Sequence, residues 1–102
     1  MRINRHKFKA VQTVTDGIKF PSKKEANRYL QLKMLQRAGN VVFFLRQVPF
    51  DLPGNTKYFV DFQIFYSDGT VTFEDVKGML TPAFVKAKKQ VESLFPVEIL
   101  VI

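Results

Sequence analysis

Residues 57–78, KYFVDFQIFYSDGTVTFEDVKG, constrain the fold more than any other part of the chain. Two runs rich in β-forming residues flank Ser67-Asp68-Gly69, a set of residues that is typical of a tight turn. The stretch therefore predicts a β-hairpin. Three acidic residues and a lysine interrupt strands that are otherwise built mainly from Phe, Val, Ile and Tyr: Asp61, Glu74, Asp75 and Lys77. Charged residues inside such strands are the first place to look for chemistry.

Strand alternation indicates how these charges are arranged. Successive side chains point to opposite faces, so Asp75 and Lys77 share a face and Glu74 points to the other. A register that pairs residue 66 with about residue 71 brings Asp61 near residues 75–77. Converging carboxylates repel each other unless a cation neutralises them, and oxygen ligands suit a hard ion such as Mg²⁺. An ordinary Asp–Lys ion pair on a half-exposed sheet face explains the spacing equally well.

The rest of the chain supplies the other elements of a mixed α/β sheet flanked by helices, in one domain spanning residues 1–102. Ser22 is the expected N-cap of the first helix, with Glu25 three residues on as a capping box, and its apolar face is expected to include Ala26, Leu30 and Met34. In order, we expect a hairpin about Asp16-Gly17, a helix over 22–39, a buried strand over 41–50, the hairpin above, a helix from Pro82 to about Phe95 and a buried strand over 97–102. After the first hairpin the order is α-β-β-β-α-β.

Charge points to a polyanionic partner. The chain carries 16 Lys and Arg against 9 Asp and Glu, a net charge of +7. Residues 1–9 form a basic arm that contains the single histidine, His6, which we expect to be solvated rather than catalytic. A strongly basic small domain favours nucleic acid over a membrane surface, and this chain has no amphipathic helix of the membrane-binding kind.

Composition excludes several classes of protein. The chain has no cysteine, which rules out disulfides, thiolate zinc sites and a cysteine nucleophile. No apolar run approaches the ~18 residues of a spanning helix, and MRINRHKFKA lacks the apolar core of a signal peptide. We therefore expect a cytoplasmic protein, in the host cell if the chain is phage-encoded.

These residues and their order resemble the PD-(D/E)XK, or restriction-endonuclease-like, nuclease superfamily. The segments FPSKKEANRYLQL, RQVPF, YFVDF, EDVKG and TPAFVKAKK look like a family of small phage-encoded endonucleases related to Holliday-junction resolvases. The resemblance covers roughly residues 17–102. It departs from the family pattern at Val60, where a proline is frequent.

The resemblance implies a role for each site residue. Asp61 and Asp75 would bind Mg²⁺ or Mn²⁺, Val76 would lend its backbone carbonyl, and Lys77 would be the catalytic lysine. Glu25 would complete the site from the helix, although helix capping alone explains its position. Gln47 is a further candidate for contact with metal or phosphate.

The expected function is a metal-dependent DNA endonuclease, selective for DNA structure, in phage DNA processing or recombination. The expected DNA contacts are basic residues on the two helices: Lys23, Lys24, Arg28, Lys86, Lys88 and Lys89. One active site cuts one strand, so cutting two strands favours a homodimer. The alternative is a non-catalytic DNA-binding or accessory protein on the same scaffold. A general RNA-binding protein is disfavoured because the pattern of exposed aromatics on RNA-reading sheets is absent.

Overall fold

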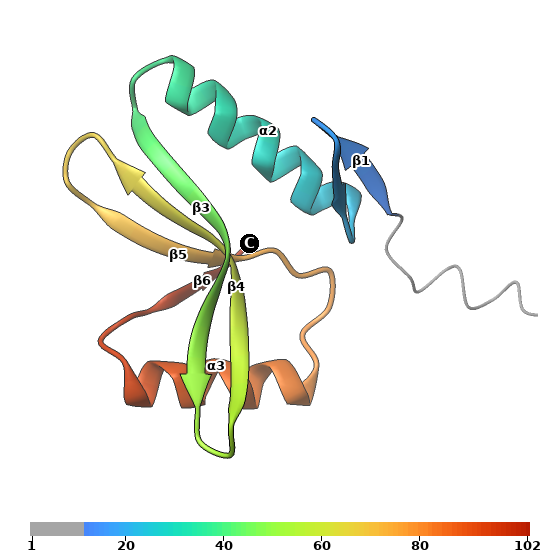
Figure 1. Cartoon of the computed structure of the whole chain (residues 1–102), viewed down its shortest axis with the longest axis vertical. Coiled ribbons are helices and arrows are strands. Elements are labelled where there is room, and N and C mark those ends of the chain that lie inside the picture. Colours follow the sequence, from blue (N-terminus) through green and yellow to red (C-terminus); the bar gives the residue numbers. More distant parts are fainter. Residues whose placement is uncertain (1–11) are drawn as a thin grey trace, which may run out of the picture.

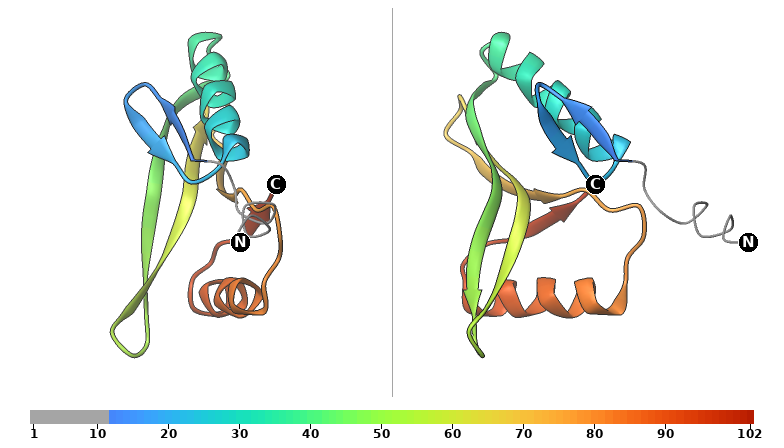
Figure 2. Two further views of the ribbon diagram at one scale, coloured as in Figure 1. Left: turned by 90° about the vertical axis from the view of Figure 1, so that its right-hand side faces the viewer. Right: turned by 45° about the vertical axis from the view of Figure 1, so that its right-hand side comes forward.

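A four-stranded mixed sheet with one helix on each side of it organises the chain (Figures 1 and 2). The computed structural model describes residues 12–102, so the predicted basic arm at residues 1–9 lies outside the described part. The predicted mixed α/β fold and its α-β-β-β-α-β order are confirmed. The elements are β1 (Thr13–Thr15), β2 (Ile18–Phe20), α2 (Lys23–Arg37), β3 (Val41–Leu52), β4 (Thr56–Tyr66), β5 (Val71–Asp75), α3 (Pro82–Leu94) and β6 (Ile99–Val101).

The strand order in the sheet is β3-β4-β5-β6. The first three strands pair antiparallel, and β6 pairs parallel with β5 after the α3 crossover. This order makes β3 an edge strand, and the expectation that residues 41–50 form a buried strand is wrong. Only Val41 is buried, while Phe43 and Leu45 are 42% and 45% exposed. An apolar run of β-formers indicates a strand but does not distinguish a central position from an edge.

Helix α2 begins and ends where its capping residues predict. The Ser22 hydroxyl accepts a hydrogen bond from the Glu25 backbone N–H at 3.1 Å, and Gly39 adopts a positive φ of 87° just past the helix. The expected apolar face is only partly correct, because Leu30 and Met34 are 43% and 64% exposed. The buried stripe instead contains Glu25, Ala26, Tyr29 and Leu32.

Two separate apolar clusters form the core. The first lies between α2 and the upper part of the sheet and includes Leu32, Phe62 and Ile64. The second lies beneath the lower part of the sheet and includes Val60, Val91 and Ile99. In the views of Figures 1 and 2, α2 and α3 lie above and below a waist at which the strands converge.

The turn between β1 and β2 lies at Asp16-Gly17, as the sequence predicts. Both residues have positive φ, 53° and 74°, which is the backbone of a tight two-residue hairpin. The Tyr29 hydroxyl donates to the Asp16 carboxylate at 2.9 Å and fastens this hairpin to α2. Neither of the two helices within residues 12–102 is long and apolar enough to cross a membrane.

Candidate active site

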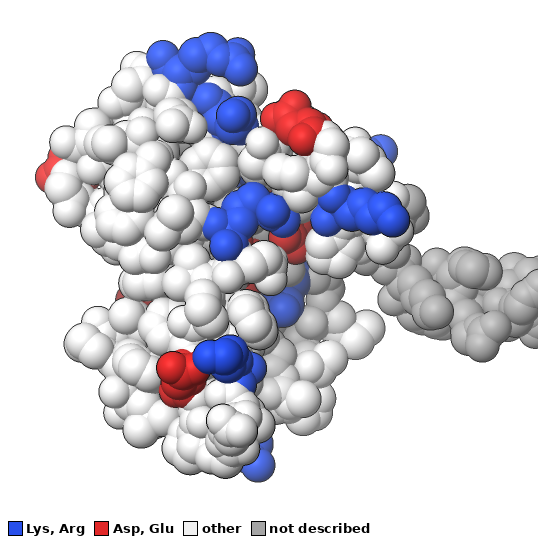
Figure 3. Space-filling view, in the orientation of Figure 1, with Lys and Arg blue, Asp and Glu red and all other residues white. Residues whose placement is uncertain are grey.

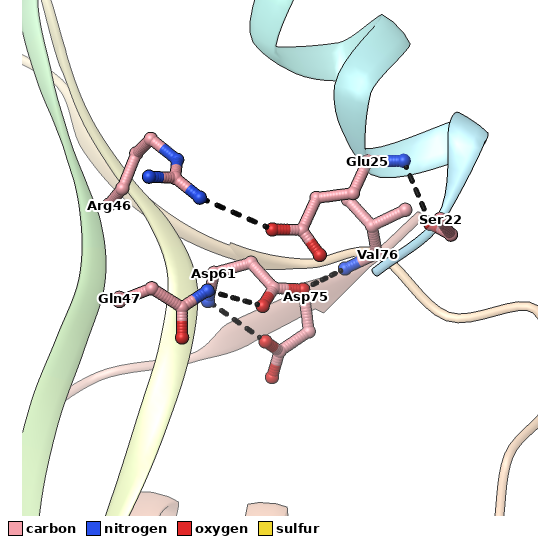
Figure 4. Close-up of polar contacts among 7 residues, drawn as sticks. All are labelled: Ser22, Glu25, Arg46, Gln47, Asp61, Asp75 and Val76. Atoms are coloured by element: carbon pink, nitrogen blue, oxygen red, sulfur yellow. Dashed lines mark hydrogen bonds and ion pairs between the residues drawn. The ribbon is translucent and has the colours of Figure 1, made fainter. Parts of the chain in front are cut away.

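The hydrogen-bonded ladder between β4 and β5 ends at the waist, at a point that we call the fork. The last paired residues are Phe62 and Glu74. Beyond them, the Asp61 backbone N–H donates to Asp75 Oδ1 at 3.0 Å, and the Val76 backbone N–H donates to Asp61 Oδ2 at 2.9 Å (Figure 4). Side-chain carboxylates therefore take over the hydrogen bonds that a continued ladder would have made.

The fork depends on a register one residue different from the expected one. Val71 pairs with Phe65 rather than with residue 66, so continuing the ladder sets Asp61 opposite Asp75. Directly opposite residues of an antiparallel pair share a face, so both carboxylates lie on the same side. The sequence predicted that these acids would converge, and they do. Glu74 lies on the other face, where Arg28 holds it in a bidentate ion pair at 2.8 Å.

Two further side chains hold the acids in place. The Tyr58 hydroxyl donates a short hydrogen bond to Asp75 Oδ2. The Gln47 amide donates to Asp61 Oδ1 at 3.2 Å, from a backbone with φ of 52° that interrupts β3. Gln47 therefore contacts a carboxylate of the site, and its contact with metal or phosphate stays a prediction. Asp75 is fully buried and Asp61 is 9% exposed.

Burial dominates the electrostatics of Asp75. Removal from water raises the pKa of its carboxyl above the ordinary value, and the charge of Asp61 raises it further. The hydrogen bonds from Tyr58 and from the Asp61 backbone oppose this shift, as does the charge of Lys77. The protein thus stabilises a buried carboxylate by donors fixed in place before any ligand arrives.

Glu25 reaches the site from the first turn of α2. Its backbone fulfils the capping expectation through Ser22, while its carboxylate points toward the fork (Figure 4). The side chain is 2% exposed, and Oε2 lies 4.0 Å from the Arg46 guanidinium without a hydrogen-bond partner. Glu25 therefore serves as a capping residue through its backbone and contributes its carboxylate to the site.

The pKa of Glu25 is the most strongly displaced among the acids of the site. Burial and the charge of Asp61 raise the pKa of Glu25 to about 7, against the opposing charges of Arg46 and Lys77. Three buried carboxyl groups thus share two nearby cationic side chains. Proton uptake by Glu25 relieves the excess negative charge, and a bound cation would relieve it in the same way.

Lys77 lies where the chain leaves β5. Its backbone N–H donates to the Ile102 carbonyl at 3.1 Å, and its own carbonyl accepts from Lys24 Nζ at 3.2 Å. The ammonium lies 4.6 Å from the centroid of the Phe84 ring, at the start of α3. Its charge lowers the pKa of both Glu25 and Asp75. Lys77 is thus within electrostatic reach of the acids while an aromatic ring supports it.

The donor set fits a hard divalent cation held by two carboxylates. Within residues 12–102, no three acidic or histidine side chains form a metal-binding group. Oε2 of Glu25 faces Arg46, and the metal-binding role that the resemblance implies for Glu25 stays a prediction. Asp61 and Asp75 suffice for Mg²⁺, which is usually bound by one or two carboxylates together with water and substrate phosphate. Each of their oxygens retains a further lone pair, and Val76 follows directly.

The predicted DNA-binding residues divide into two groups. Arg28 is bound to Glu74, and Lys88 pairs with Glu92 at 2.9 Å, so neither is a free cation for phosphate. The remaining four are exposed: Lys23, Lys24, Lys86 and Lys89. Charged side chains of both signs are visible at the waist of the molecule (Figure 3).

Sequence reasoning missed Tyr58 and Arg46. Arg46 is the one charged residue inside VVFFLRQVPF, and that isolation is a signal that could have identified it. Tyr58 stands among aromatic strand residues with nothing in the sequence to distinguish it. Its role depends on the bend of the β3–β4 hairpin toward α3, which no local pattern encodes.

Comparison with known proteins adds a family without an assigned activity. The family model described as Protein of unknown function (DUF1064) matches residues 5–99. A search of the curated proteins finds no match.

Glu25 is expected to make folding stability depend on pH in a metal-free solution with EDTA. Its pKa is raised to about 7 in the folded state, against 4.5 ordinarily. Its contribution is therefore fully present below pH 4.5 and is lost as the pH rises through 7. The loss is on the order of 3 kcal/mol. Urea unfolding of wild type and Glu25→Gln between pH 4.5 and 8.5 measures it.

The Glu25→Gln variant should lack this part of the pH dependence, because glutamine does not ionise. Glu98→Gln, at an exposed glutamate, is the matched control and should retain the wild-type slope. An unchanged slope in Glu25→Gln would show that Glu25 titrates normally.

Proposed function

Because the chain belongs to the DUF1064 family, whose function is unknown, its activity has to be argued from the site, and we propose that it is a metal-dependent DNA endonuclease of the PD-(D/E)XK superfamily. The observation that carries the proposal is the interlocked pair of Asp61 and Asp75 at the fork, with Lys77 two residues further along. The simpler alternative is a solvent-exposed Asp–Lys ion pair. In such a pair, both acids would not be buried and the lysine would not lie on an aromatic ring.

The proposed cofactor is Mg²⁺ or Mn²⁺, held by Asp61 and Asp75 with the backbone carbonyl of Val76. When bound, such an ion polarises a phosphoryl oxygen, lowers the pKa of water and stabilises the leaving oxygen. Tyr58 and Gln47 fix the two carboxylates before the ion binds, and this lowers the cost of organising the site. The reaction is hydrolysis of a phosphodiester by in-line attack of water.

Lys77 and Glu25 supply charge and proton transfer around that centre. Lys77 can orient the attacking water or neutralise charge on the phosphorus as an ammonium, and it could take a proton from that water only as the neutral amine. Glu25, with a pKa of about 7, exchanges its proton near neutral pH, as a general acid or base requires. Arg46 faces Glu25 across 4.0 Å and limits the rise of that pKa.

The proposed substrate is DNA, approached over exposed lysines on the two helices. Lys23 and Lys24 lie at the start of α2, and Lys86 and Lys89 lie on α3. Such contacts position a phosphate backbone without reading sequence, and this favours selectivity for DNA structure. The proposed setting is phage DNA processing or recombination, in the cytoplasm of the host cell.

The main alternative is a non-catalytic DNA-binding or accessory protein with the same fold. In that case, the buried acids serve only to end the β4–β5 ladder. Glu25 Oε2 argues against this alternative, because it is buried without a hydrogen-bond partner. The hydrogen bonds that end the ladder do not require this third buried carboxyl group.

Substitution of the site is the direct test of the nuclease proposal. We expect Asp75→Ala and Lys77→Ala each to lower Mg²⁺-dependent cutting by at least about a hundredfold, because each removes a charge used in the reaction. Labelled junction, flap, duplex and single-stranded DNA, incubated with Mg²⁺, Mn²⁺ or EDTA, measure the cutting. DNA binding and the circular dichroism spectrum should remain close to wild type.

The control for this experiment is Asp51→Ala, at an exposed aspartate that pairs with Lys57 far from the fork. It should cut like wild type. Full activity of Asp75→Ala, or full activity in EDTA, would exclude the proposed site.

Metal binding separates the nuclease from the accessory protein. We expect Mn²⁺ to raise the melting temperature of the wild-type protein, because an ion bound only to the folded state stabilises it by mass action. The shift should vanish in Asp61→Ala and persist in Asp51→Ala. A wild-type protein indifferent to Mn²⁺ would favour the accessory interpretation.

We propose a homodimer as the form that cuts two strands. One face of the upper sheet carries exposed apolar residues and no charge: Phe43, Leu45 and Val71, with Phe65 stacked on Phe43 at 4.3 Å between ring centroids. A two-fold axis through this face would bury the same residues of both copies. Light scattering at the concentration used for cleavage should give twice the chain mass of 11.8 kDa, and a monomer with full two-strand activity would contradict the dimer.

A further inference from the structure

An open hollow of about 470 Å³ lies on the solvent side of α3. Its lining on the helix repeats at i, i+3, i+4 and i+7, which is one stripe along a helix surface. The stripe faces away from the buried residues of α3, and the loop before the helix closes one end of the hollow. The lining residues are Leu80, Pro82, Val85, Lys86 and Lys89.

The loop that closes the hollow displays two adjacent apolar side chains. Met79 is 65% exposed and Leu80 is 58% exposed. The loop is fixed at both ends, by the backbone bonds of Lys77 to Ile102 and Lys24, and by Thr81, whose hydroxyl accepts from the Phe84 N–H at 3.1 Å. Adjacent exposed apolar residues on an anchored loop are characteristic of a binding surface, because folding alone gains nothing from them.

The chemistry of the hollow suits one nucleotide. Leu80, Pro82 and Val85 form an aliphatic floor for the face of a base, and leucine, methionine and proline are residues that wedge against bases in DNA complexes. Lys86 and Lys89 lie at the rim, where the adjoining phosphates would pass, and no acidic residue lines the hollow. The lining contains no Asn, Gln, Asp or Glu side chain to read base edges, and the two lysines lie at the phosphate rim, so we expect little preference among bases.

The hollow lies close to the reacting centre. The first turn of α3 separates it from Lys77, whose ammonium rests on the Phe84 ring within that turn. A helix is about 10 Å across, and successive phosphates of a duplex strand are about 3.4 Å apart along the duplex axis. A strand therefore needs roughly three nucleotides to pass from one side of α3 to the other. A paired base in a continuous duplex is stacked and cannot enter, whereas a flap, junction or strand end offers an unpaired base. On this geometry, and resting on the proposed function, we infer that the hollow binds an unpaired nucleotide roughly three steps from the scissile phosphodiester, with Met79 and Leu80 as the wedge.

The test uses DNA carrying 2-aminopurine either at the base of a flap or within a continuous duplex, with EDTA present so that no strand is cut. Wild type should bind the flap more tightly and change the fluorescence of the flap probe. The Met79→Ala/Leu80→Ala double variant should lose about tenfold in flap affinity, because two apolar side chains no longer pack against the base. Its duplex affinity should stay within about twofold, because the phosphate contacts remain.

The matched control is the Leu30→Ala/Met34→Ala double variant, which removes an exposed leucine and methionine from α2. It should bind both DNAs like wild type. Equal losses on flap and duplex, or no loss on either, would overturn the inference. Failure of wild type to bind any DNA would overturn both this inference and the DNA-binding premise. Selective flap binding without cutting in Mg²⁺ would support the hollow and exclude the nuclease.

Discussion

The reciprocal hydrogen bonds between Asp61 and the Asp75–Val76 segment are the interaction on which the rest of the structure depends. Two backbone N–H groups that a longer ladder would have used bind carboxylates instead. Because buried N–H groups must be satisfied, the two carboxylates supply the acceptors that let the ladder end at this point. Beyond the fork, the first half of β4 lies near α3, and the chain that follows β5 enters the loop before α3. These two hydrogen bonds thus lie where the sheet passes from one apolar cluster to the other.

This arrangement concentrates negative charge where water is scarce. Asp61, Asp75 and Glu25 are all nearly or fully buried. The two aspartates have donors for their oxygens, whereas Glu25 Oε2 has none and faces Arg46 at a distance too long for a hydrogen bond. Buried charge with a single distant cationic partner is costly, so proton uptake by Glu25 is favourable. The raised pKa of Glu25 expresses this cost.

The sequence predicted the elements better than their environments. The start of α2 at Ser22 followed from capping chemistry, which is local, and the meeting of Asp61 and Asp75 followed from a turn and strand alternation. Burial was harder to predict from the sequence, because Phe43 and Leu45 lie on an edge strand that only the strand order of the sheet defines. The same limit applies to Arg28, since nothing local indicates that Glu74, 46 positions along the chain, holds it. Contacts between elements distant in sequence determine which side chains are buried or paired where the local pattern does not.

Lys77 is the residue at which the two halves of the molecule meet. Its carbonyl accepts from Lys24 on α2, and its ammonium lies on Phe84 of α3, so both helices contribute to its position. The acids belong to the sheet between them. Because each half has its own apolar cluster, the position of Lys77 relative to Asp75 depends on how the two clusters meet at the waist. Phosphate contacts on the lysines of both helices would act on this junction, and binding of DNA would thereby be coupled to the geometry of the site.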